Sequence, residues 1–188
     1  MTLALGECSD GELAALALAG RQAAYRELLG RHREAVFRLV RGSIGDSDAA
    51  LDVTQEAFIA AFAALKSYDG NRPFKTWVSR IAINKCRDWA RRRAVRRFFS
   101  FALPIEAAAT VADESIPADQ QVADRAELAR VKTAIAKLPM AIREPLVLRT
   151  IEGLSQAEAA QVLGISEKAV ETRIYRARKA LQADVSSV

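Results

Sequence analysis

Apolar residues recur along this chain at intervals of three and four, the spacing that places them on one face of a helix. No stretch has the pattern of a sheet strand. Ser9 followed by Glu12 has the spacing of a capping box and predicts a short first helix. A longer apolar stripe predicts a second helix over residues 22–41, which Gly42 and Gly45 are expected to end.

The helical pattern continues through the rest of the chain. Asp46 or Asp48 is expected to cap a third helix that runs to about residue 66. Residues 68–73 form a predicted turn, since Asp-Gly and Pro both interrupt helices. A fourth helix is expected to begin near Phe74 and to continue into a run of arginines. The fold class is therefore all-α, with further helices predicted near 125–137, 140–151, 155–163 and from 167 onward.

Residues 155–181 have the spacing of a helix-turn-helix unit. A small Ala160, a turn glycine at Gly164 and an apolar Val170 follow one another at intervals of four and six. The second helix of such a unit enters the major groove of DNA, so its outward residues are candidate contacts. These residues are Lys168, Glu171, Thr172, Arg173, Tyr175, Arg176, Arg178 and Lys179.

Two interpretations of this charged helix face are open. Most charged stripes are solvated surface, and this one could be no more than that. However, Arg can donate two hydrogen bonds to guanine, Glu can accept one from cytosine, and Lys can neutralise a phosphate. DNA contact is favoured because the turn chemistry and the excess of basic residues occur in the same segment.

The fourth predicted helix has a narrow basic face. Arg80, Asn84, Arg87 and Arg91 recur at intervals of four, three and four, and five of residues 91–97 are arginines. Such a face neutralises phosphates, and a nearby aromatic residue such as Trp77 offers a surface on which an unpaired base could stack. Trp77 is equally a candidate core residue. Asn84 can recognise a base edge or be an ordinary exposed polar residue, and the sequence pattern does not decide between them.

The third predicted helix has the opposite charge. Asp52, Gln55 and Glu56 cluster on one side, while Leu51 and Phe58 are expected to pack on the other. No Lys or Arg occurs between residues 46 and 65. Nucleic acid would be repelled by this surface. It is therefore either plain solvated surface or a docking site for a basic protein.

Charge also divides the chain into segments. The formal net charge is +5 and the pI is about 9.5, which favours a polyanionic partner. Residues 99–124 contain no Lys or Arg, and they carry acidic residues together with Pro104 and Pro117. This composition predicts a flexible acidic linker between a first domain, residues 1–98, and a second domain, residues 125–188.

Composition also excludes several classes of site. Two cysteines and a lone His32 cannot form a disulfide framework or a four-ligand zinc site. With no glycine-rich phosphate loop either, we expect no enzyme activity, no cofactor and no metal. The longest apolar run, residues 57–65, is nine residues long, which is too short to cross a membrane. We therefore expect a cytoplasmic protein without membrane insertion.

Two sets of motifs resemble bacterial sigma factors of the extracytoplasmic-function (ECF) group. Residues that resemble the second sigma domain, a four-helix unit, lie at 52–58 (Asp-Val-Thr-Gln-Glu-Ala-Phe), 68–70 (Tyr-Asp-Gly) and 74–84 (Phe-Lys-Thr-Trp-Val-Ser-Arg-Ile-Ala-Ile-Asn). Residues that resemble the fourth sigma domain lie at 138–139, 143–148, 152–160 and 173–178.

The resemblance implies a promoter-specificity subunit with core RNA polymerase and promoter DNA as partners. Asp52, Gln55 and Glu56 would dock on the clamp helices of the largest polymerase subunit, and the fourth domain would meet the polymerase flap. The helix from residue 167 would recognise the minus-thirty-five element, and an anti-sigma factor would hold the protein inactive until stress. The minus-ten element, with one base flipped out of the non-template strand, would be bound by Gly70, Asn71, Arg72, Lys75, Trp77, Arg80, Asn84, Arg87 and Arg91.

Two other classes of function compete with this one. The first is a helix-turn-helix regulator that binds DNA without polymerase; such a protein needs neither the acidic surface nor the single-strand features around Asn84. The second is an enzyme that acts on nucleic acid, but no carboxylate cluster has the spacing of metal ligands.

Overall fold

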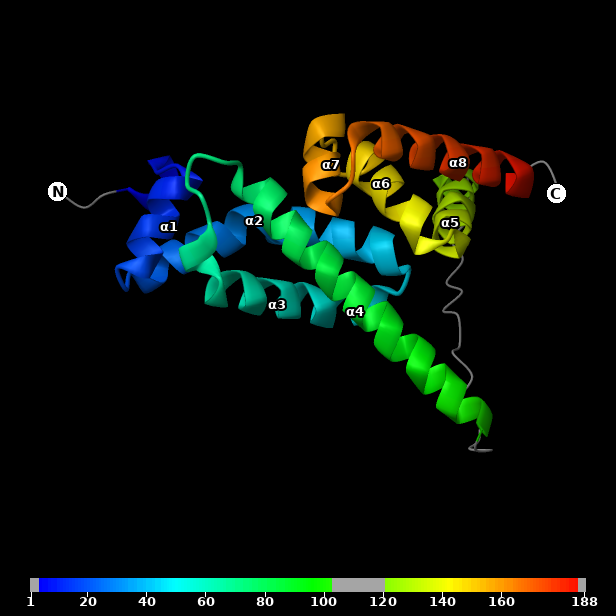
Figure 1. Ribbon diagram of the computed structural model, residues 1–188, viewed down its shortest axis with the longest axis horizontal. Coiled ribbons are helices and arrows are strands. Elements are labelled where there is room, and N and C mark those ends of the chain that lie inside the picture. Colours follow the sequence, from blue (N-terminus) through cyan, green and yellow to red (C-terminus); the bar gives the residue numbers. More distant parts are fainter. Residues whose placement is uncertain (1–3, 103–120, 186–188) are drawn as a thin grey trace.

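The computed structural model describes residues 4–102 and 121–185. These residues form eight α-helices and two short 3-10 helices, and they contain no strand, so the all-α prediction is confirmed. The helices lie in two groups (Figure 1). We call residues 4–102 the first half and residues 121–185 the second half.

The first half consists of four α-helices and both 3-10 helices. Ser9 and Glu12 form the predicted capping box, in which each side chain bonds the other residue's backbone amide. Asp46 caps the third helix by accepting a hydrogen bond from the amide of Ala49. The elements are η1 (Leu5–Glu7), α1 (Asp10–Leu18), α2 (Gln22–Ile44), α3 (Ser47–Ala63), η2 (Leu65–Ser67) and α4 (Phe74–Ala102).

The second half consists of four α-helices. Ser155 and Glu158 form a second capping box at the start of its third helix, as the sequence predicts. Gly164 ends that helix with a φ of +68°, a left-handed conformation that favours glycine. The helices are α5 (Gln121–Lys137), α6 (Met140–Thr150), α7 (Gln156–Leu163) and α8 (Glu167–Val185).

Four helix boundaries differ from the prediction. Gly42 does not end α2: it lies inside the helix, and only Gly45 ends it, with a φ of +71°. The third helix stops at Ala63, and a 3-10 turn covers the last residues before the loop. The helices α4 and α5 extend to Ala102 and back to Gln121, so both enter the expected linker, whose residues 103–120 lie outside the described residues.

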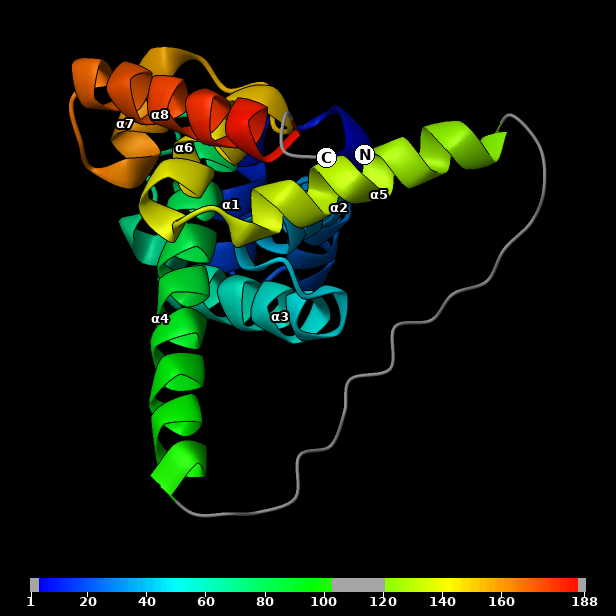
Figure 2. The same cartoon turned by 90° about the vertical axis from the view of Figure 1, so that its right-hand side faces the viewer.

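The two halves pack against each other. Helix α7 contacts α4, and α6 contacts α2 (Figures 1 and 2). A single hydrophobic cluster extends across both halves, from Leu13 in α1 to Val170 in α8. Gly42 makes this approach possible, because a Cβ atom there would lie 2.9 Å from Cγ1 of Val147 in α6. We call this packing of the two halves the closed arrangement.

Helix α4 extends beyond the packed part of the molecule. Its N-terminal portion contributes buried residues such as Val78, Ala82 and Ile83 to the core. Its C-terminal portion projects away from the other helices (Figure 2), and Phe98 and Phe99 there are exposed. Helix α4 therefore starts inside the closed arrangement and ends in solvent.

Candidate nucleic-acid and polymerase interfaces

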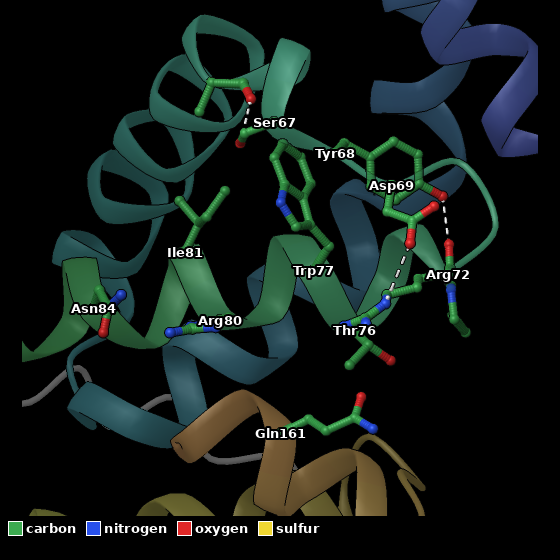
Figure 3. A pocket seen from close by; sticks show the side chains of 12 residues that line it. Ser67, Tyr68, Asp69, Arg72, Thr76, Trp77, Arg80, Ile81, Asn84 and Gln161 are labelled. Carbon is green, nitrogen blue, oxygen red and sulfur yellow. Dashed lines mark hydrogen bonds and ion pairs between the residues drawn. The ribbon is translucent and has the colours of Figure 1, made fainter.

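A pocket of about 550 Å³ lies at the start of α4. The loop before α4 forms one side, α4 itself forms the floor, and α7 of the second half lies opposite (Figure 3). Its lining combines aromatic, amide and guanidinium groups, which suit a flat polar ligand. It is lined by Ala64, Ser67, Tyr68, Asp69, Arg72, Pro73, Thr76, Trp77, Arg80, Ile81, Asn84 and Gln161.

Aromatic packing gives the pocket a rigid wall. Trp77 is half-buried, with its ring centroid 5.2 Å from that of Tyr68 and 5.3 Å from that of the fully buried Phe74. Trp77 therefore belongs to the core and lines the pocket as well, so both interpretations of this residue apply. Burial raises the pKa of Tyr68 above its ordinary value, so its hydroxyl stays protonated and donates to the carbonyl of Arg72 at 2.5 Å.

The loop before α4 is held in place by its own polar groups. Asp69 forms an ion pair with Arg72 at 3.3 Å and accepts a hydrogen bond from the backbone amide of Asn71 at 3.1 Å. The backbone of Gly70 lies against Gly11 in α1, where a Cβ atom would lie 2.6 Å from the Gly70 carbonyl oxygen. The side chains of Asn71 and Arg72 remain exposed beside the pocket.

The predicted minus-ten residues separate into two groups. Arg72, Trp77, Arg80 and Asn84 line the pocket together, and Arg80 and Asn84 are both exposed on α4 (Figure 3). Among the remaining residues, Gly70 and Asn71 lie in the adjoining loop, and Arg91 is two turns further along α4, paired with Asp88. Lys75 and Arg87 point instead toward the second half.

Lys75 and Arg87 are bound by carboxylates of the second half. Nε and Nη2 of Arg87 donate to the two carboxylate oxygens of Glu144, at 3.0 and 2.6 Å. This pairing raises the pKa of the Arg87 guanidinium. Nζ of Lys75 donates to the backbone carbonyl of Glu152 at 2.7 Å and lies 3.4 Å from its carboxylate. Neither cation is free to bind DNA in the closed arrangement.

The acidic surface of α3 lies on the outside of the molecule. Asp52 and Gln55 are exposed, and Glu56 is half-buried beside Arg92, whose Nη2 donates to it at 3.2 Å. The expectation that Leu51 packs inward is wrong: it is 48% exposed, because the helix turns it outward next to Asp52. With Ile59, which is 70% exposed, it adds apolar groups to the acidic surface.

The helix-turn-helix forms as predicted. Val170 and Ala177 of α8 are buried, and Ser166 caps the helix by accepting from the amide of Ala169 at 3.2 Å. Helix α8 packs on α6 and α7 and lies on the side of the molecule away from α3 (Figure 1). Thr172 and Arg173 are half-buried, and the other candidate contacts are exposed: Lys168, Glu171, Tyr175, Arg176, Arg178 and Lys179.

Among the described residues, no group of three or more His, Cys, Asp or Glu residues has a geometry that could hold a metal ion. No helix in the same ranges is long and apolar enough to span a membrane. Cys8 and Cys86 are both buried and unbonded to each other, and burial raises the pKa of the Cys86 thiol to about 12.

Several residues at these sites are not among those predicted from the sequence. Gln161 lines the pocket from α7, and Glu144 and Glu152 bind the two cations named above. The available signal was a charged pair, Arg143 and Glu144, within an apolar helix, since charged residues are rarely buried without partners.

The first half thus contains a pocket lined by basic and aromatic side chains, and the second half contains a helix-turn-helix with an exposed basic helix. Both halves match known families. Residues 28–96 match the family model for sigma-70 region 2, and residues 128–181 match that for sigma-70 region 4. The first match includes the pocket residues of the first half, and the second includes the helix-turn-helix and Gln161.

Curated proteins and a solved structure extend the match to almost the whole chain. The RNA polymerase sigma factor CnrH of Cupriavidus metallidurans is 46% identical, over 94% of each chain. The ECF RNA polymerase sigma factor SigW of Bacillus subtilis is 34% identical, over 87% of this chain and 89% of the relative. The structure of CnrH in complex with the cytosolic domain of CnrY superposes with a TM-score of 0.69 at 37% identity, covering 96% of this chain and 99% of the other.

The chain therefore belongs to the ECF group of the sigma-70 family of RNA polymerase sigma factors. Its role is that of a transcription initiation factor, and its fold is the pair of sigma-type helical units predicted from the motifs.

Proposed function

We propose that the pocket at the start of α4 captures one unpaired base of the minus-ten element. The observation that carries this is the grouping of Trp77, Arg80 and Asn84 in one pocket of about 550 Å³. The ring of Trp77 offers a stacking surface, the amide of Asn84 can bond a base edge, and Arg80 can hold the neighbouring phosphate. Unstacking the base costs a few kcal/mol, which these contacts offset.

The rest of the minus-ten site extends the strand contact along α4 and the loop before it. Lys75, Arg87 and Arg91 provide cations for successive phosphates, while Gly70, Asn71 and Arg72 border the base. Lys75 and Arg87 reach the strand only after they leave Glu152 and Glu144. In this proposal, residues 1–98 act as one domain and residues 125–188 as the other, joined by the segment 99–124.

The α3 surface is the proposed polymerase docking site. Asp52, Gln55 and Glu56 supply hydrogen-bond acceptors and negative charge, and the exposed Leu51 and Ile59 supply apolar contact area. Protein interfaces combine apolar and polar groups in this way, so this surface is better explained as a docking site than as plain solvated surface. Its partner would be the clamp helices of the largest polymerase subunit, with the second half on the flap.

Helix α8 is the proposed reader of the minus-thirty-five element in duplex DNA. Its exposed Arg176, Arg178 and Lys179 provide phosphate and base contacts, together with Lys168, Glu171, Thr172, Arg173 and Tyr175. We also propose control by an anti-sigma factor, because the CnrH structure is a complex with the cytosolic domain of CnrY. The protein would work in the cytoplasm, where polymerase is, and carry out no catalysis of its own.

A polymerase-independent helix-turn-helix regulator is the alternative function. It accounts for α8 but leaves the acidic surface and the pocket without a role. The two functions differ in what the purified protein does alone. A sigma factor binds promoter duplex weakly without polymerase, whereas a dimeric regulator binds a palindromic site tightly.

The Asn84→Ala variant tests the base-capture site. It should slow promoter opening by roughly 5- to 150-fold, since loss of a bidentate base contact removes ~1–3 kcal/mol. Closed-complex formation should change little, because the phosphate contacts remain. Permanganate footprinting of the melted region and gel-shift titration of the closed complex measure the two steps with holoenzyme.

Glu7→Ala, in the exposed η1 turn, serves as the control variant for this experiment. It should behave as the wild type in both measurements. An equal loss of opening and closed binding in Asn84→Ala would contradict the base-capture role.

A further inference from the structure

The contact between the two halves contains charged groups that are almost inaccessible to solvent. Glu144 is 1% exposed and Glu152 is 5% exposed. Glu144 receives both hydrogen bonds of the Arg87 fork. The carboxylate of Glu152 lies 3.3 Å from Nε of Arg38 and 3.4 Å from Nζ of Lys75. A buried carboxylate without a cation is strongly unfavourable, so the closed arrangement depends on these three partners.

All three cations come from the first half, and two of them belong to the proposed minus-ten site. The two-point bond from Arg87 to Glu144 has the same geometry that a guanidinium uses for a phosphate group. A DNA strand that binds Arg87 and Lys75 must therefore displace the carboxylates of Glu144 and Glu152 from them. Strand and carboxylate cannot occupy the same guanidinium fork at once.

Helix α7 also opposes binding of a DNA strand to α4 sterically, in addition to the competition between charges. Gln161 of α7 forms part of the wall of the base pocket (Figure 3). Helix α7 packs directly on α4, so a strand that follows the basic face of α4 meets α7 in its path. In contrast, Arg176, Arg178 and Lys179 on α8 stay exposed. The closed arrangement thus occupies two cations of one proposed DNA site and leaves the other site accessible.

We propose that Glu144 and Glu152 act as an internal competitor of single-stranded DNA, which masks the minus-ten site until the two halves separate. This inference rests on the proposed function of α4. It assigns the second half a role beyond duplex recognition: its carboxylates occupy the cations that the promoter strand needs. The free protein then binds a single strand with an affinity reduced by the small fraction of open molecules.

The double variant Glu144→Gln/Glu152→Gln tests the competition directly. Glutamine keeps the side-chain shape while removing the charge that holds Arg87, Lys75 and Arg38. Small-angle X-ray scattering should show a larger radius of gyration than for the wild type. Fluorescence anisotropy with a labelled single-stranded DNA of about 12 nucleotides should show at least ~10-fold tighter binding.

Gly42→Phe separates the halves by a different route. Its side chain has no room against Val147, where even a Cβ atom would lie 2.9 Å from Cγ1, and no charged group changes. This variant should also expand and bind the strand more tightly, with all its minus-ten residues intact. The double variant Glu7→Gln/Glu27→Gln is the control for charge. It removes two negative charges, as the test variant does, but in η1 and α2, away from the contact between halves. It should match the wild type.

Three results would overturn the proposal. The wild type could already have the radius of an extended two-domain protein. The variants could remain as compact as the wild type with unchanged strand affinity. Finally, they could expand without any gain in affinity, which would exclude competition. Promoter-specific transcription by the wild type with core polymerase is measured separately, so that failure of the masking is distinguished from failure of the proposed function.

Discussion

At the scale of single residues, the buried position of Cys86 determines how reactive its thiol is. It lies on α4 between the basic face and the core, and the structure buries it completely. Burial is the main cause that raises its pKa to about 12. The thiolate is the reactive form of cysteine, so this residue is chemically inert in the folded protein.

The reactivity of Cys86 gives a prediction. In a Cys8→Ala variant, where Cys86 is the remaining thiol, reaction with Ellman's reagent at pH 8 should be at least ~100-fold slower in the folded protein than in denaturant. The rate should rise with pH because the thiolate fraction increases toward the raised pKa. Absorbance at several pH values measures this, and rapid native labelling at pH 8 would show that the thiol is not buried as described.

Residues whose role depends on local chemistry were predictable from the sequence, and those that depend on a distant partner were not. Asn84 and Arg80 were placed on one face by helical spacing alone, and they do line one pocket. The outward position of Leu51 was missed because its helix has apolar residues on more than one side. The roles of Glu144 and Gln161 required knowledge of what α6 and α7 pack against.

At the scale of elements, the caps are the most reliable signals in this chain. Ser155 accepts a hydrogen bond from the amide of Glu158 at 3.2 Å, and its own amide donates to the Glu158 carboxylate at 2.7 Å. Both bonds join residues three positions apart, so the motif is visible in the sequence. This pairing lowers the pKa of Glu158, which keeps the carboxylate ionised at the N-terminus of α7.

Removal of the Ser155 cap should destabilise the second half. Ser155→Ala is expected to lower the free energy of unfolding by about 1 kcal/mol, since an amide at the start of α7 loses its acceptor. Urea denaturation followed by circular dichroism measures the change, and Ser155→Thr, which keeps a hydroxyl, should restore most of it. An unchanged midpoint for Ser155→Ala would show that the cap contributes nothing to the stability of α7.

At the scale of the whole molecule, the packing of the two halves against each other could not be predicted from the sequence pattern. Arg87 and Glu144 are 57 positions apart, and each looks like an ordinary charge on its own helix. The halves were predicted as separate domains with an acidic segment between them. In the structure, one hydrophobic cluster extends across both halves, with Gly42 as the point of close approach.

Transcription in vitro measures what the molecule does with polymerase. Purified protein, core RNA polymerase and a promoter library with two elements should give initiation at defined sites. The Asp52→Arg/Glu56→Arg variant should stay folded by circular dichroism yet lose both polymerase binding and transcripts, because positive charge replaces the acidic surface of α3. Polymerase-independent, tight binding of the wild type to a palindromic site, or undiminished transcription by the variant, would contradict the account.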